Sequence, residues 1–200
     1  MIVIPRLYAI ADAAFGNPVE IARQLFDGGA RLVQIRNKRA SASELMRQVE
    51  EILPFVPAGF RLIVNDRLDV ALLTQAHGVH LGQEDLPAEH ARRILGTSAF
   101  IGVSTHNMAQ ALQADGLPVD YIAVGPIYAT TSKDNPSPVL GLEKLREICR
   151  AVRKPVVAIG GITVERAPEV YGAGAGSVAV ISDILKAKNI CDRTREWSSL

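Results

Sequence analysis

Acidic side chains at the ends of two β-rich runs are the first candidates for chemistry. The run 61–66 ends in Asn65 and Asp66, and the run 78–83 leads into Glu84 and Asp85. Mg²⁺ is typically held by one or two carboxylates together with waters and substrate phosphates. If the two runs are neighbouring strands, Asp66 and Asp85 can lie side by side and hold a magnesium diphosphate. Asp85 has an alternative interpretation, because Asp85-Leu86-Pro87 also fits an N-cap ahead of a helix.

Basic and amide side chains gather at the end of another run, QIRNK. Strand alternation places Gln34 and Arg36 on one face and Val33 and Ile35 on the other. A buried arginine needs an anion, so Arg36 is predicted to contact an oxyanion or a pyrophosphate. The alternative is a structural ion pair inside the fold.

Hydroxyl groups and a lysine follow the run 120–127. The segment GPIYATTSK places Thr130, Thr131, Ser132 and Lys133 in succession, which suits a phosphate-binding loop. The next segment, KDNPSPVLG, is rich in turn-forming residues and is expected to form a long loop that closes over the site. An ordinary solvated loop is the alternative.

The last two β-rich runs end in small residues followed by helix signals. Gly160-Gly161 precedes Thr163, and Ile181-Ser182 precedes a short helical segment. Glycine permits close approach of the backbone to a ligand, and helix N-termini direct N–H groups toward anions. A tight turn and a helix cap are the structural alternatives, and they are compatible with anion binding because they use the same donors.

The four histidines provide less information. His77 and His80 lack the spacing of metal ligands on a helix, His90 is expected on a helix surface, and only His106 follows the end of a β-rich run. His106 is therefore kept as an alternative catalytic residue. No Ser-His-Asp order or zinc-ligand spacing is present.

Eight β-rich runs position these side chains. The segments between them have helical periodicity and caps: Asn17-Pro18 begins one helix that Gly28-Gly29 ends, and Ser41 with Glu44 fits a capping box. Such alternation is typical of repeated βαβ units with a parallel sheet. The eight runs are 6–12, 30–36, 61–66, 78–83, 100–105, 120–127, 155–161 and 176–182.

The predicted fold is a single (β/α)8 barrel over residues 1–200, with a short polar C-terminal tail from about residue 187. An open doubly wound sheet that binds a dinucleotide would normally have a GxGxxG turn after its first strand, and the chain has IADAAF there. A chain of 200 residues leaves no room for a second catalytic domain. In such barrels the active site lies at the carboxyl ends of the strands, where the candidate residues occur.

Charge and hydropathy exclude several classes of partner. With 22 Lys and Arg against 21 Asp and Glu, the chain lacks the basic field of a nucleic-acid-binding protein. No apolar stretch reaches the length of a membrane span, and no signal-peptide pattern begins the chain, so a cytoplasmic location is expected. Small molecules are the expected partners, and a homo-oligomer is compatible with the sequence. Cys149 and Cys191 are expected to be reduced, structural thiols.

Seven segments, in order, resemble the thiamine-phosphate synthase family, also called thiamine-phosphate pyrophosphorylase. The resemblance implies a Mg²⁺-dependent transferase that joins a hydroxymethylpyrimidine diphosphate to a thiazole phosphate and releases diphosphate, with ionisation of the pyrimidine first. The segments are QIRNK, VNDRLDVAL, GVHLGQEDLP, IGVSTHN, DYIAVGPIYATTSK, PVVAIGGI and VAVIS.

The resemblance also implies roles for individual residues. Asp66 and Asp85 would hold the Mg²⁺, and Arg36, Lys38, Ser104 and Lys133 would act in catalysis. The residues implied for the pyrimidine diphosphate are Gln34, Arg36, Lys38, Asn65, Ser104 and Lys133. Those implied for the thiazole phosphate are Thr130, Thr131, Ser132, Gly161, Ile181 and Ser182.

The chain departs from the family pattern at a few positions. Asn37 stands where the family usually has glutamate, Ser132 where it usually has threonine, and the first run ends in IAD where VTD is common. Two alternative functions stay open. One is the thiazole tautomerase branch of the same superfamily, in which a histidine near the position of His106 matters. The other is a barrel that senses a phosphate ligand without turnover.

Overall fold

Eight parallel strands close into a barrel in a computed structural model that describes residues 4–130 and 138–200. Each strand pairs with the next in the sequence, and the first also pairs with the last. All eight predicted strands and the barrel are confirmed. The strands are β1 (Leu7–Asp12), β2 (Leu32–Arg36), β3 (Arg61–Asn65), β4 (Gly78–Leu81), β5 (Phe100–Thr105), β6 (Tyr121–Val124), β7 (Val156–Ile159) and β8 (Ser177–Val180).

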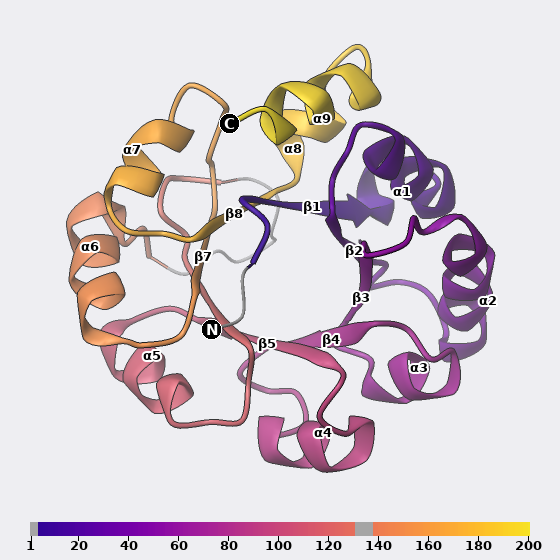
Figure 1. Ribbon diagram of the computed structural model, residues 1–200, viewed down its shortest axis with the longest axis horizontal. Helices are drawn as coiled ribbons and strands as arrows, with labels where there is room; N and C mark the ends of the chain where they lie inside the picture. Colours follow the sequence, from indigo (N-terminus) through magenta and orange to yellow (C-terminus); the bar gives the residue numbers. More distant parts are fainter. Residues whose placement is uncertain (1–3, 131–137) are drawn as a thin grey trace.

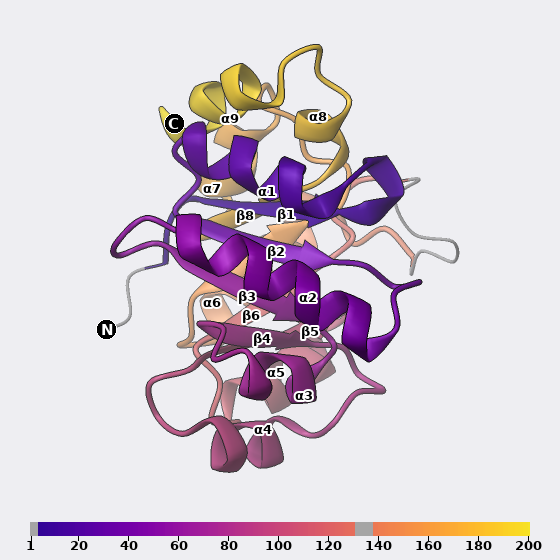
Figure 2. The same cartoon turned by 90° about the vertical axis from the view of Figure 1, so that its right-hand side faces the viewer.

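Helices form a ring around the barrel (Figure 1), and in the side view the strands lie side by side behind the helices that cover them (Figure 2). None of the helices in the described ranges has the length and apolar character needed to span a bilayer. The helices are η1 (Ala13–Phe15), α1 (Pro18–Asp27), α2 (Ala42–Ile52), η2 (Leu53–Phe55), α3 (Leu68–Leu73), α4 (Ala88–Leu95), α5 (Met108–Asp115), α6 (Gly141–Ala151), α7 (Ala167–Gly172), α8 (Ser182–Leu185) and α9 (Ile190–Ser198).

Local sequence signals begin α1 and α2 as predicted. The Asn17 side chain accepts a hydrogen bond from the Val19 N–H at 2.9 Å, and Pro18 occupies the first turn of α1. The Ser41 hydroxyl likewise accepts from the Glu44 N–H at 3.2 Å at the start of α2. These caps satisfy N–H groups that the first turn of a helix cannot satisfy itself.

Aromatic side chains fill part of the barrel interior. Tyr8 of β1 and Tyr121 of β6 are both fully buried, and their rings meet edge to face with centroids 5.7 Å apart. Gly102 of β5 makes room for Tyr121, because a Cβ at residue 102 would lie 1.9 Å from the Tyr121 Cζ. The register, which pairs Gly102 with Tyr121, therefore fixes where the large ring can fit.

The segment predicted as a polar tail forms helix α9. Trp197 is completely buried although its neighbours in the sequence are polar, and α9 packs against α1 and α8. Burial of the large Trp197 ring fixes this helix against its neighbours, which the polar composition of the segment did not indicate. Cys149 and Cys191 are both free thiols.

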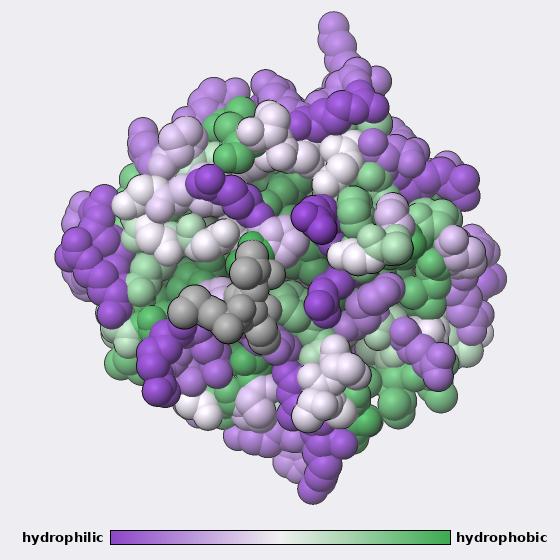
Figure 3. Space-filling view, in the orientation of Figure 1, coloured by the Kyte–Doolittle hydropathy of each residue, from purple (hydrophilic) through white to green (hydrophobic). Residues whose placement is uncertain are grey.

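The two ends of the barrel differ. In Figure 2 the strands run from left to right, so their carboxyl ends and the loops that follow them lie on the right. Figures 1 and 3 show the opposite end, where hydrophilic side chains form much of the rim. The candidate site belongs to the carboxyl end, where the polar residues singled out in the sequence gather.

Candidate active site

A cavity opens at the carboxyl ends of the strands. It continues inward to Tyr8 and His80, and it has both polar and apolar walls. The structure thus brings together predicted residues that are up to 148 positions apart, from Gln34 to Ser182. The predicted substrate residues that line it are Gln34, Arg36, Asn65, Ser104, Thr130, Gly161, Ile181 and Ser182.

Three predicted residues lie outside the described part of the chain. These are Thr131, Ser132 and Lys133, and most of the loop expected to close over the site, KDNPSPVLG, lies there as well. Their roles stay predictions.

The predicted acidic pair lies at the ends of neighbouring strands. Burial raises the pKa of Asp66, and the Asp85 carboxylate raises it further, while Lys38 lowers it. The Lys38 Nζ lies 3.5 Å from the Asp66 Oδ2. Two carboxylates that repel each other in a partly buried place, with one lysine beside them, form a site suited to a cation.

Local backbone geometry fixes both acids. Asp66 has a φ of 61°, a conformation that most residues avoid, and its N–H donates to the His80 carbonyl at 2.8 Å. The Asp85 Oδ2 accepts from the Gly82 N–H at 2.6 Å, which closes the turn after β4. Pro87, not Asp85, is the N-cap of α4, so the capping alternative for Asp85 is wrong.

An acid that the sequence analysis passed over pairs with Arg36. Asp12 ends β1 and lies opposite Arg36 in the register, and the Arg36 Nη1 donates to the Asp12 Oδ2. The Asp12 Oδ1 accepts from the Ala14 N–H at 2.9 Å. The ion pair considered as an alternative for Arg36 therefore exists. The pairing with Asp12 leaves other N–H groups of the Arg36 guanidinium for a second anion, because arginine has five such donors.

Asn37 makes contacts away from the cavity. Its Nδ2 donates to the Gln48 Oε1 of α2 at 3.2 Å, and its Oδ1 accepts from the N–H groups of Arg39 and Ala40. In this chain residue 37 thus holds the loop after β2 against α2. The departure from glutamate has a local structural role.

Buried hydrogen bonds connect five side chains across the barrel. Gln34 donates to the Tyr8 hydroxyl at 2.7 Å, and Tyr121 donates to the same hydroxyl at 2.9 Å. His80 contacts the Tyr121 hydroxyl through Nδ1 at 2.9 Å and the Ser104 hydroxyl through Nε2 at 2.8 Å. Burial raises the pKa of both tyrosines, so both stay protonated at neutral pH.

The directions of these bonds assign the His80 tautomer. Because Tyr121 gives its proton to Tyr8, it must accept from the His80 Nδ1–H. The Nε2 of a neutral imidazole is then an acceptor, so the Ser104 hydroxyl donates to it. Ser104 therefore presents oxygen lone pairs toward a ligand. The sequence analysis missed Tyr8, Tyr121 and His80 because inward-facing aromatic residues are usually core.

The loops after β6, β7 and β8 form the opposite wall. Gly160 and Gly161 have φ values of 105° and 63°, and a Cβ at Gly161 would lie 2.4 Å from the Ala129 carbonyl oxygen. Only glycine allows these two backbones to approach so closely. The Arg166 Nη1 donates to the Gly161 carbonyl at 2.7 Å, and its guanidinium lies 4.5 Å from the centre of the Tyr128 ring.

His106 also lines the cavity. Its Nδ1 lies 2.8 Å from the Gly125 carbonyl, which can only accept, so this nitrogen carries a proton. The ring is thereby fixed at the end of β5. No group of three or more His, Cys, Asp or Glu side chains within 4–130 and 138–200 has the arrangement of a metal site.

The model of a protein family described as thiamine monophosphate synthase matches residues 7–184. The chain belongs to this family. A thiamine-phosphate synthase from Koribacter versatilis is 48% identical over 189 residues, which cover 91% of this chain and 90% of that protein. A thiamine-phosphate synthase from Methanocella arvoryzae is 41% identical over 198 residues, which cover 97% of this chain and 93% of that protein. Membership in the thiamine monophosphate synthase family confirms the resemblance seen in the sequence.

Solved structures agree with this family. A thiamine phosphate pyrophosphorylase from Pyrococcus furiosus superposes with a TM-score of 0.88 at 36% identity, covering 98% of this chain and 94% of that one. A second pyrophosphorylase, from Bacteroides thetaiotaomicron, has a TM-score of 0.73 at 17% identity. At that identity the likeness shows the fold alone.

Proposed function

We propose that the chain joins a hydroxymethylpyrimidine diphosphate to a thiazole phosphate and releases diphosphate. The observation that carries the proposal is one cavity with two different walls. Arg36 and Asn65 line one wall, with Lys38, Asp66 and Asp85 next to them outside the cavity lining, and Gly161 and Ser182 line the opposite wall. A wall with an arginine, flanked by two acids and a lysine, suits a metal diphosphate, and a wall with glycine and hydroxyl groups suits a monophosphate.

Asp66 and Asp85 would hold the Mg²⁺. Burial, and then the neighbouring Asp85 carboxylate, raise the pKa of Asp66, and a divalent cation would relieve the repulsion between the two carboxylates. When bound, the ion would neutralise charge on the diphosphate and make it a better leaving group. Two carboxylates are enough for Mg²⁺ when substrate oxygens and waters supply the remaining ligands.

The residues of the chain mainly orient and neutralise. Arg36, held by Asp12, and Lys38 would stabilise the diphosphate as the bond from the pyrimidine methylene to oxygen breaks and the electron pair leaves with the diphosphate. Gln34 and Ser104, fixed by Tyr8 and His80, would orient the pyrimidine. The phosphate wall would place the thiazole nitrogen to form the new carbon–nitrogen bond. No strong base is needed for this step.

Purified protein with both precursors and Mg²⁺ tests the proposal. Thiamine phosphate and diphosphate are the expected products. Isomerisation of the thiazole phosphate without condensation would favour the tautomerase, for which the fixed ring of His106 in the cavity is the supporting observation. Binding of thiazole phosphate without any turnover would favour a sensing barrel.

The division of the site has its own test. Asp66→Ala should abolish synthesis and leave binding of thiazole phosphate largely intact. Asp69→Ala is the matched control, because Asp69 is an exposed acid three residues away that pairs with Arg67. Equal loss of synthesis and of thiazole-phosphate binding in Asp66→Ala would contradict the division.

A further inference from the structure

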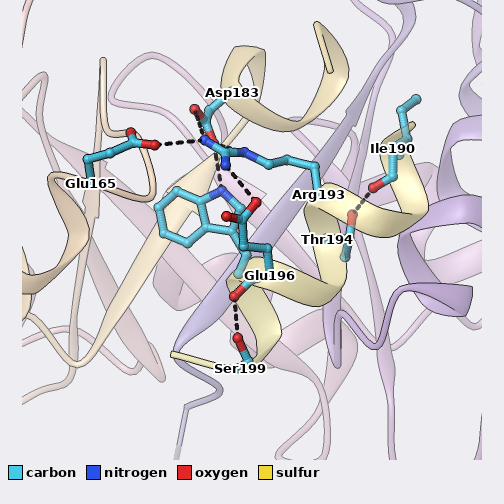
Figure 4. A network of polar contacts seen from close by, with 8 residues as sticks. Glu165, Asp183, Ile190, Arg193, Thr194, Glu196 and Ser199 are labelled. Carbon is cyan, nitrogen blue, oxygen red and sulfur yellow. Dashed lines mark hydrogen bonds and ion pairs between the residues drawn. The ribbon is translucent and has the colours of Figure 1, made fainter. Parts of the chain in front are cut away.

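One arginine of helix α9 connects to the loops after both β7 and β8. The Arg193 Nε and Nη2 donate to the two carboxylate oxygens of Asp183, at 3.0 and 2.9 Å. The Nη2 also lies 3.4 Å from the Glu165 Oε1, and the Nη1 donates to the Glu196 Oε2 at 2.6 Å. Figure 4 shows the guanidinium between Glu165 and Asp183, with Glu196 on its own helix.

Asp183 is the centre of this network. Its side chain is only 11% exposed, and its Oδ2 accepts a third hydrogen bond, from the Trp197 Nε1 at 2.7 Å. It follows Ser182 directly in the first turn of α8, and Ser182 lines the cavity. A two-point contact between guanidinium and carboxylate fixes orientation as well as distance. The orientation of Asp183 therefore determines where the turn containing Ser182 lies.

The pairing also removes a charge conflict. A carboxylate one residue from a phosphate-binding hydroxyl would repel the anion if it were not neutralised. The guanidinium of Arg193 supplies the opposite charge at hydrogen-bond distance, and these carboxylates raise the pKa of Arg193, which keeps it charged. Two separate effects, position and charge, thus depend on the same side chain.

The packing of helix α9 fixes the position of Arg193. Trp197 and Thr194 are completely buried, and the Ser198 hydroxyl donates to the Gly28 carbonyl at 3.2 Å. A Cβ at Gly28 would lie 2.5 Å from the Thr194 Cβ, so α9 and the end of α1 are in close contact. A helix held in this way resists movement of the loops that Arg193 joins.

We propose that Arg193 is a positioning residue for the phosphate of the second substrate. It holds the turn at Ser182 and the loop containing Glu165 in the arrangement that binds the anion, and it neutralises Asp183. The proposal rests on the proposed function, since it takes the wall of Gly161 and Ser182 to be the monophosphate site. Arg193 itself does not touch the substrate.

The test compares Arg193→Ala with Arg195→Ala. Arg195 lies on the same helix, is exposed and pairs with Asp192 of its own helix, so the control removes the same charge without breaking the network. Arg193→Ala should raise the KM for thiazole phosphate about tenfold, the scale of one lost charge-assisted hydrogen bond. It should leave the KM for the pyrimidine diphosphate within about twofold. Arg195→Ala should change neither.

A second variant keeps the test decisive if Arg193→Ala fails to fold. Trp197→Phe keeps a buried aromatic ring but removes the N–H that donates to Asp183 together with part of the indole. It should raise the KM for thiazole phosphate in the same direction by a smaller factor. Arg193→Lys keeps the charge but loses the two-point contact, so it should fall between the wild type and Arg193→Ala.

Calorimetric titration with thiazole phosphate alone separates the two proposals. If the wild-type protein binds this ligand but makes no product, the proposed function fails, while the ratio of dissociation constants between Arg193→Ala and the wild type still tests the role of Arg193. Unchanged affinity for thiazole phosphate in a folded Arg193→Ala would overturn the proposal. Equal weakening for both substrates would also overturn it, because it would indicate general support of the fold.

Discussion

Removal of a single oxygen atom from the barrel interior tests the buried hydrogen bonds most directly. In Tyr121→Phe the ring remains, and so does its stacking on Phe100, whose centroid lies 5.2 Å away. The change removes the donor to the Tyr8 hydroxyl and the acceptor for His80, both at 2.9 Å. The packing contribution is nearly unchanged, so the effect reports the hydrogen bonds alone.

The expected loss of stability follows from two buried bonds. Each contributes about 0.5–1.5 kcal/mol net, so Tyr121→Phe should lower the free energy of unfolding by about 1–3 kcal/mol. For a chain of this size, about 1 kcal/mol shifts the Tm by roughly 2–4 °C, so a decrease of about 5 °C is expected. Because His80 orients Ser104, the KM for the pyrimidine diphosphate should rise as well.

Thermal and urea unfolding, monitored by circular dichroism, measure the effect. Tyr171→Phe is the control, because the Tyr171 hydroxyl donates to the Arg6 carbonyl at 3.0 Å in an exposed position. It should cost less than about 1 kcal/mol. Equal shifts in Tm for the two variants would refute the reasoning, since they would show that the interior hydroxyl contributes no more than a surface one.

Three further predictions concern the walls of the site. Asp12→Asn leaves Arg36 without its charged partner and should lower the free energy of unfolding by about 3 kcal/mol in urea titrations, whereas an unchanged midpoint would contradict the ion pair as a stabilising element. Gly161→Ala places a Cβ 2.4 Å from a carbonyl oxygen and should raise the KM for thiazole phosphate at least tenfold, while normal affinity would show that the loop gives way. In the absence of Mg²⁺, burial and Asp85 raise the pKa of Asp66 above its ordinary 3.8. Folding then favours the protonated form, and stability falls as the pH rises from 3.8 through the raised pKa. Asp66→Asn should therefore stabilise the metal-free protein at pH 7 and not below pH 3.8, as thermal melts at both pH values would reveal; the opposite trend would contradict the assigned shift.

Adjacency in the barrel follows directly from the sequence. Once eight β-rich runs are ordered along the chain, neighbouring runs become neighbouring strands, and this places Asp66 beside Asp85. The interpretation of Asp85 as a helix cap could be rejected only from the structure, because the cap depends on the residue at which α4 begins.

Interior polar contacts could not be predicted in the same way. Asp12 pairs with Arg36 because of the strand register, which a sequence pattern leaves open by a residue. Tyr8, Tyr121 and His80 alternate with apolar residues as any core aromatic would, and only the three-dimensional arrangement shows that their polar atoms meet. The burial of Trp197 was concealed for a similar reason, since most of the residues around it in α9 are polar.

Closure of the barrel between β1 and β8 has a consequence for synthesis of the chain. The edge of β1 stays unpaired until residues 177–180 have been made, because its second partner is the last strand. A nascent chain that has emerged only through β6 already contains Asp66 and Asp85 but lacks Gly161 and Ser182. The acidic wall therefore exists before the wall opposite it, and an unpaired edge is open to wrong pairing during that interval. The two walls can face each other only after β7, β8 and the first turn of α8 have been made.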